Sequence, residues 1–110
     1  MIHLPESLAA WRTPAFRDTL RRELAGLPAR AFALERFVSA GDRALAEDLG
    51  FDVRVPDPEA PAPTAHIAVF FDVQVQCCSC GDEPVLEAGC AWFTLRIDPR
   101  DASASLTPLL

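Results

Sequence analysis

The four cysteines are the residues of this 110-residue chain whose type and spacing best suit a chemical role. Cys77, Cys78 and Cys80 fall in one short run, and Cys90 follows later in the chain. Thiolates are preferred zinc ligands, and structural zinc usually takes four ligands in a tetrahedron. Cys77 and Cys80 have the two-residue gap found in many such sites. The sequence therefore predicts that Cys77, Cys78, Cys80 and Cys90 hold a structural zinc ion.

Two other interpretations of the same cysteines stay open. A free cysteine often packs as a small apolar residue, and Cys77 continues the apolar side of a predicted strand. A redox pair is the other alternative, but it needs a thiolate stabilised by a basic group or a helix N-terminus. The nearby acidic residues Asp82, Glu83 and Glu87 disfavour such a thiolate. Inert thiols are thus the stronger alternative to zinc.

Two strands are predicted to position the cysteines. In residues 67–77 the odd positions are apolar and most of the even positions are polar, and residues 90–98 alternate in a similar way. Such alternation indicates antiparallel strands with one buried face. A turn-rich segment that contains Gly81 and Pro84 separates the two strands.

The expected pairing of these strands decides which cysteines meet. If the chain turns tightly, Gln76 lies opposite Cys90. Cys78 is then the diagonal neighbour of Cys90, and Cys80 follows at the same end of the polar face. Cys77 would point into the core.

The polar face of the same strands also carries two aromatic residues, Phe70 and Trp92. Under the tight-turn pairing, Arg96 lies opposite Phe70 and diagonal to Asp72. Exposed aromatic residues and arginine are enriched at protein interfaces. Phe70, Trp92 and Arg96 are therefore candidate interface residues. Either another part of the chain covers this face, such as residues 29–49 or the tail, or a second subunit or protein partner does.

The remaining sequence predicts an α+β fold, in which an N-terminal helix packs on one face of an antiparallel meander of three to four strands. Thr13 and Pro14 are a typical helix start, and Gly26 and Pro28 are a typical stop. Apolar residues between them repeat at helical spacing, so we expect a helix over 14–25.

The 110 residues are predicted to form a single domain. Its segments are a helical part (5–27), an ambiguous part (29–50), a β-meander (51–98) and a tail (99–110). Within the ambiguous part, Ala44 to Leu49 resembles a helical turn. At the start of the tail, Asp98 and Pro99 favour another helical turn.

Charge and composition narrow the classes of partner. The net charge is −6, and it resides in the second half, because residues 1–54 carry as many arginines as acidic residues. An acidic sheet repels phosphate, so no nucleic-acid partner is expected. Pro5 and Glu6 interrupt any signal peptide, and no apolar run reaches the roughly 20 residues of a membrane helix. We therefore expect no membrane association and a cytoplasmic location, in which thiols stay reduced.

The absence of Lys, Asn and Tyr beside abundant Ala and Pro suggests a GC-rich bacterial source. The sequence lacks the motifs of nucleotide-binding and hydrolytic enzymes. It thus favours a non-enzymatic binding or interaction module whose cysteine cluster holds structural zinc. The first alternative is a metal-free homodimer that uses the Phe70 and Trp92 face. The second is a thiol-dependent redox protein.

Overall fold

The computed structural model describes residues 2–39, 41–75 and 85–109 as two helices, two short 3-10 turns and five strands. In chain order these elements are β1 (Ile2–His3), α1 (Pro5–Ala10), α2 (Phe16–Ala25), η1 (Ala29–Phe32), η2 (Leu34–Phe37), β2 (Arg43–Arg54), β3 (Thr64–Val75), β4 (Val85–Ile97) and β5 (Ser103–Pro108). The α+β class and the antiparallel sheet match the sequence prediction, but there are more strands than the three to four expected.

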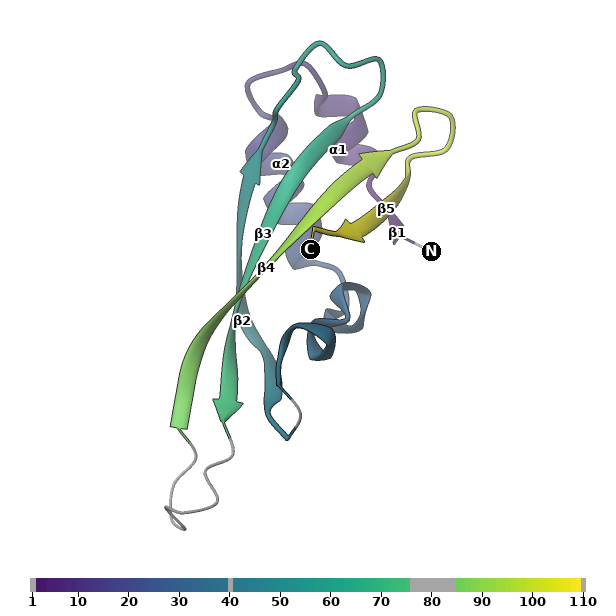
Figure 1. Cartoon of the computed structure of the whole chain (residues 1–110). Coiled ribbons are helices and arrows are strands. Elements are labelled where there is room, and N and C mark those ends of the chain that lie inside the picture. Colours follow the sequence, from purple (N-terminus) through teal and green to yellow (C-terminus); the bar gives the residue numbers. More distant parts are fainter. Residues whose placement is uncertain (1, 40, 76–84, 110) are drawn as a thin grey trace.

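The five strands form one sheet in the order β1-β5-β4-β3-β2 (Figure 1). Strands β2 to β5 follow one another as an antiparallel meander, and β1 pairs with the outer edge of β5. The β3–β4 hairpin is the longest pairing, and its register is regular from Thr64 opposite Arg96 to Val75 opposite Val85.

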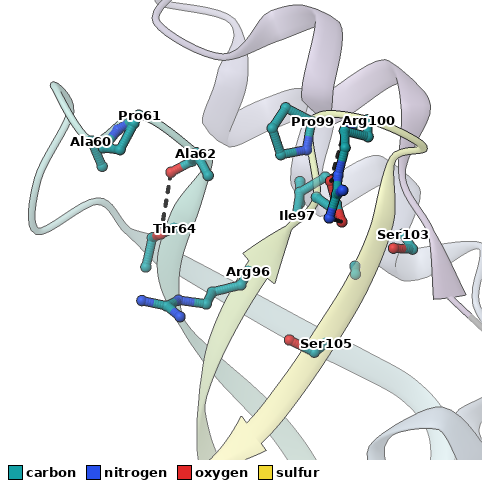
Figure 2. A pocket seen from close by; sticks show the side chains of 12 residues that line it. Ala60, Pro61, Ala62, Thr64, Arg96, Ile97, Pro99, Arg100, Ser103 and Ser105 are labelled. Carbon is teal, nitrogen blue, oxygen red and sulfur yellow. Dashed lines mark hydrogen bonds and ion pairs between the residues drawn. The ribbon is translucent and has the colours of Figure 1, made fainter.

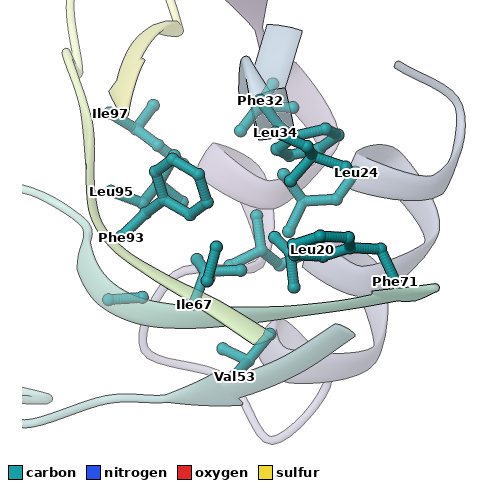
Figure 3. Close-up of a cluster of buried hydrophobic side chains, with 14 of the residues drawn as sticks. Leu20, Leu24, Phe32, Leu34, Val53, Ile67, Phe71, Phe93, Leu95 and Ile97 are labelled. Carbon is teal, nitrogen blue, oxygen red and sulfur yellow. The ribbon is translucent and has the colours of Figure 1, made fainter. Parts of the chain in front are cut away.

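Both helices and both 3-10 turns lie on one face of this sheet (Figure 1). Phe16, Leu20 and Leu24 are buried on α2, where they repeat at the spacing of one helix face. They pack against the buried odd-numbered residues of the two central strands (Figure 3), which are Ala65, Ile67, Val69, Phe71, Ala91, Phe93, Leu95 and Ile97. The alternation read from the sequence therefore reports the pleat of β3 and β4.

Helix α2 begins at Phe16, two residues later than the expected start at Pro14. The reason is the local role of Thr13. Its hydroxyl donates to the Ala10 carbonyl (2.7 Å) and accepts the Ala15 N–H (3.2 Å). Thr13 thus closes a turn between α1 and α2 instead of capping the first turn of α2.

The segment 29–50, which the sequence left open, divides into η1, η2 and the first half of β2. The expectation of a helical turn over Ala44 to Leu49 was wrong. Ala44 pairs with Val73 across the β2–β3 ladder, and a bulge between Leu45 and Gly50 shifts the register. Asp48 adopts a positive φ of 55° within this bulge. The extra residues of the bulge explain why the local pattern does not alternate strictly.

The tail forms strand β5, and the helical turn expected at Asp98 and Pro99 is a hairpin turn instead. The Asp98 carbonyl accepts the Ala102 N–H (2.8 Å), and the Asp98 N–H donates to the Ser103 carbonyl (2.7 Å). Pairing with β4 then continues to Pro108 opposite Phe93. None of the helices in the described ranges has the length and apolar character required to span a bilayer.

Candidate functional site

The sheet face opposite the helices carries the best candidate for a functional surface. We call it the open face, and its centre consists of the even-numbered side chains of β3 and β4, flanked by Asp52 and Arg54 of β2. Phe70 lies on it with 46% of its surface exposed, next to the partly exposed Trp92 on the adjacent strand. Both aromatic residues are therefore on the solvent side of the sheet, as the sequence predicts.

Trp92 and Arg54 make a contact that covers the middle of the open face. The Arg54 guanidinium carbon lies 5.1 Å from the centre of the Trp92 ring. Arg54 is on β2 and Trp92 is on β4, so the two side chains meet above β3, which runs between them. Ala68, the cross-strand partner of Trp92, is fully buried. The contact is a cation–π interaction, and Asp52 holds the other side of Arg54 at 3.6 Å.

Phe70 stands between two small residues. Its cross-strand neighbours are Gly50 on β2 and Cys90 on β4. Because neither neighbour is large, the Phe70 ring projects beside the Trp92–Arg54 contact instead of being enclosed. Large and small residues thus alternate on the open face, with Phe70 beside Cys90 and Trp92 beside Ala68.

The described parts of the two segments proposed as a cover for this face do not cover it. Phe32 of η1 and Leu34 of η2 belong to the buried core on the helix face. The tail extends the sheet sideways as β5 and does not fold over it. Within the ranges that the structure describes, Phe70 therefore faces solvent.

The strand register differs from the one that the sequence suggested. Cys90 lies opposite Phe70 and not opposite Gln76, and Arg96 lies opposite Thr64 and not opposite Phe70. The tight-turn assumption was wrong, because β4 already begins at Val85. Arg96 is thus six residues along β4 from Cys90, or about 20 Å away.

Three of the predicted zinc ligands, Cys77, Cys78 and Cys80, lie outside the described residues. Cys90 is a free and exposed cysteine on the open face. The regular pairing of β3 and β4 removes the argument that placed Cys90 diagonal to Cys78. The described ranges contain no group of three or more His, Cys, Asp and Glu side chains suited to a metal ion.

Arg96 lines a hollow of about 840 Å³ at the end of the sheet (Figure 2). The hollow lies between the chain segment that enters β3 and the β4–β5 turn, and it also includes Thr64 and Ser105. Arg100 is held by Asp98 through its backbone N–H (2.9 Å) and its Nε (3.4 Å). By contrast, the Arg96 side chain makes no hydrogen bond or ion pair within the described part of the chain.

One carboxyl group near this hollow has a shifted pKa. The pKa of Asp101 lies below its ordinary value, first because the Ser103 hydroxyl donates a hydrogen bond to the carboxylate, and then because the Ser103 N–H does so. The N–H bond measures 2.9 Å. Asp101 is exposed, so this shift reports the closure of the β4–β5 turn and does not indicate a catalytic acid.

Sequence reasoning identified Phe70 and Trp92 but missed Arg54. The pattern held a usable signal, since Arg54 follows Val53 in the alternating stretch that begins at Phe51. What could not be read was that β2 is the strand next to β3 on the side away from Trp92. No protein-family model, no curated protein and no solved structure matches the chain.

Proposed function

We propose that the chain is a non-enzymatic protein-interaction module that binds its partner through the open face. The observation that carries the proposal is the solvent-facing aromatic surface that Phe70 and Trp92 form on the sheet. Aromatic residues together with arginine are enriched at protein interaction sites.

The surface is also held in place before binding. Trp92 is fixed from one side by the Arg54 cation and from below by Ala68. The Trp92 ring lies over β3, which is paired with a neighbouring strand on both edges. A rigid aromatic group loses little entropy when it is buried by a partner, so this arrangement favours binding.

A zinc ion in the cysteine cluster remains a separate proposal about how the far end of the hairpin is organised. The open face does not depend on it, because the pairing of β3 with β4 already positions Phe70 and Trp92. The proposed binding function therefore does not require zinc.

The proposal is tested by placing the photo-crosslinker p-benzoylphenylalanine at Phe70 and, as a matched control, at Val85. Val85 has a similar exposed fraction (49%) but has the opposite strand parity. Irradiation in living cells should give a discrete adduct from position 70 and none from position 85.

The adduct should also disappear when Trp92→Ala is introduced in the same chain, because the partner needs both aromatic groups. Equal labelling from both positions, or an adduct that still forms in the Trp92→Ala variant, contradicts the proposal.

A further inference from the structure

We infer that the partner of the open face is a second copy of this chain, packed face to face about a two-fold axis. This inference rests on the proposed function, because it requires that the open face is a binding surface. The axis lies in the interface, runs perpendicular to β3 and passes at the level of Val69. Two sheets packed in this way are about 10 Å apart, with strand directions within roughly 30° of being aligned.

The size of the side chains is self-complementary about this axis. The axis places Phe70 of one copy over position 68 of the other, where the Trp92 ring covers Ala68. It likewise places Trp92 over Cys90 of the other copy. Each large ring therefore packs against a small residue of the other copy or against the face of an aromatic ring. Phe70 and Trp92 stack twice, once on each side of the axis.

The charges are self-complementary about the same axis. His66 of one copy faces Asp72 of the other, and Arg54 lies next to His66 across the β2–β3 ladder. The Asp72 side chain makes no hydrogen bond or ion pair within the described part of its own chain. His66 and Arg54 of each copy thus lie near Asp72 of the other copy. The two-fold axis generates this contact twice, once on each side.

The available area fits a small, reversible interface. From the level of Thr64 to that of Asp72, the two copies overlap through β2, β3 and β4, because β5 pairs only with residues 93–97 of β4 and lies outside the overlap. This face measures about 30 Å by about 14 Å, or roughly 400 Å² before the protrusion of the side chains is added. A standard interface uses roughly 800 Å² of accessible surface on each partner. A second copy is therefore a partner of suitable shape and charge, held by an interface at the small end of the usual range.

The first experiment is sedimentation equilibrium of the purified full chain from about 1 to about 100 μM, a range that covers moderate affinities. We expect a reversible dimer. Phe70→Ser should raise the dimer Kd by roughly tenfold or more, as truncation of a central aromatic residue does. The matched control Val85→Ser, which has the opposite strand parity, should leave the Kd unchanged.

A charge exchange provides the sharper test. His66→Asp places two acids opposite each other, and Asp72→Arg places two basic groups opposite each other, so each single variant should weaken the dimer by roughly tenfold. The double variant restores an opposite-charge pair across the axis and should return to within about threefold of the native Kd. Positions 66 and 72 of one strand are about 20 Å apart, so such rescue cannot arise within one chain.

The outcomes separate this inference from the proposed function. A monomer at all concentrations, a dimer that ignores Phe70→Ser, or a double variant without rescue overturns the two-fold dimer. If the position-70 crosslinker then gives a discrete adduct with a different protein, the proposed function stands alone. If it gives no adduct, both are overturned. Circular dichroism of each variant confirms that the change is not one of folding.

Discussion

At the scale of single residues, the position of Cys90 bears on whether it is a zinc ligand or an inert thiol. It is exposed on the open face, five residues along β4 from Val85, which corresponds to about 17 Å. A site that uses Cys77, Cys78 and Cys80 must therefore reach well along the hairpin to include Cys90 as its fourth ligand.

The zinc prediction is tested by metal analysis of protein purified without an affinity tag. A structural site should retain about one zinc ion per chain, and Cys80→Ser should lose it. A chelator should then make thiols reactive that were slow before. Cys90→Ser is the informative control, because zinc retained in that variant removes Cys90 from the ligand set. A zinc content below about 0.2 per chain rejects the site altogether.

At this scale the sequence predicted which face a side chain occupies, but not which residues meet across strands. Phe70 and Trp92 follow from parity alone, since the pleat alternates with a period of two. The pairing of Arg96 with Thr64 does not follow, because it depends on the length of the connection between β3 and β4. A slip by an even number of residues preserves every face and changes every neighbour.

At the scale of elements, we expect the same substitution to alanine to have a large effect on stability at one glycine of the sheet and a small effect at another. A Cβ at Gly89 would lie 2.8 Å from Cε2 of Phe71 and 2.9 Å from Cγ2 of Val73. Phe71 is 4% exposed and packed in the core, so its ring has little freedom to move away. A Cβ at Gly50 would make ordinary contacts of 3.5 Å and more with Phe70.

Gly89→Ala should therefore lower the free energy of unfolding by about 1–3 kcal/mol, the usual cost of overpacking. Gly50→Ala should change it by less than about 1 kcal/mol, since alanine fits and favours extended backbone slightly more than glycine does. Urea denaturation followed by circular dichroism measures both. Equal destabilisation by the two variants would show that the Phe71 ring does not occupy the space above Gly89.

The elements that were predicted well are those with strong local patterns. The helix over Phe16–Ala25 and the strands β3 and β4 each bury one face against the same core, so their apolar spacing is visible. The strand character of the first half of β2 and of β5 was missed for different reasons. The bulge interrupts the alternation in β2, and β5 consists largely of small residues whose strand state comes from pairing with β4.

At the scale of the whole molecule, the fold is elongated. It measures 53 × 23 × 21 Å, and its radius of gyration is 15.8 Å, compared with about 13 Å for a compact domain of this length. The cause is visible in Figure 1, where the β3–β4 hairpin continues beyond the helices. Val85 (49% exposed) and Leu86 (58% exposed) have opposite strand parity, so this part of the hairpin is uncovered on both faces.

This shape predicts two levels of local stability within one strand. The amides of residues 86–88 are held only by the β3–β4 ladder, whereas those of residues 91–95 lie over the buried core. In the dilute monomer, the amides of residues 86–88 should exchange through local opening that costs about 1–2 kcal/mol, and the core amides should approach the global value of about 5 kcal/mol or more. Native-state hydrogen exchange by NMR measures both groups in one experiment. Equal protection along β4 would mean that the far end of the hairpin is covered in solution, and exchange at several protein concentrations would show whether a second copy covers it.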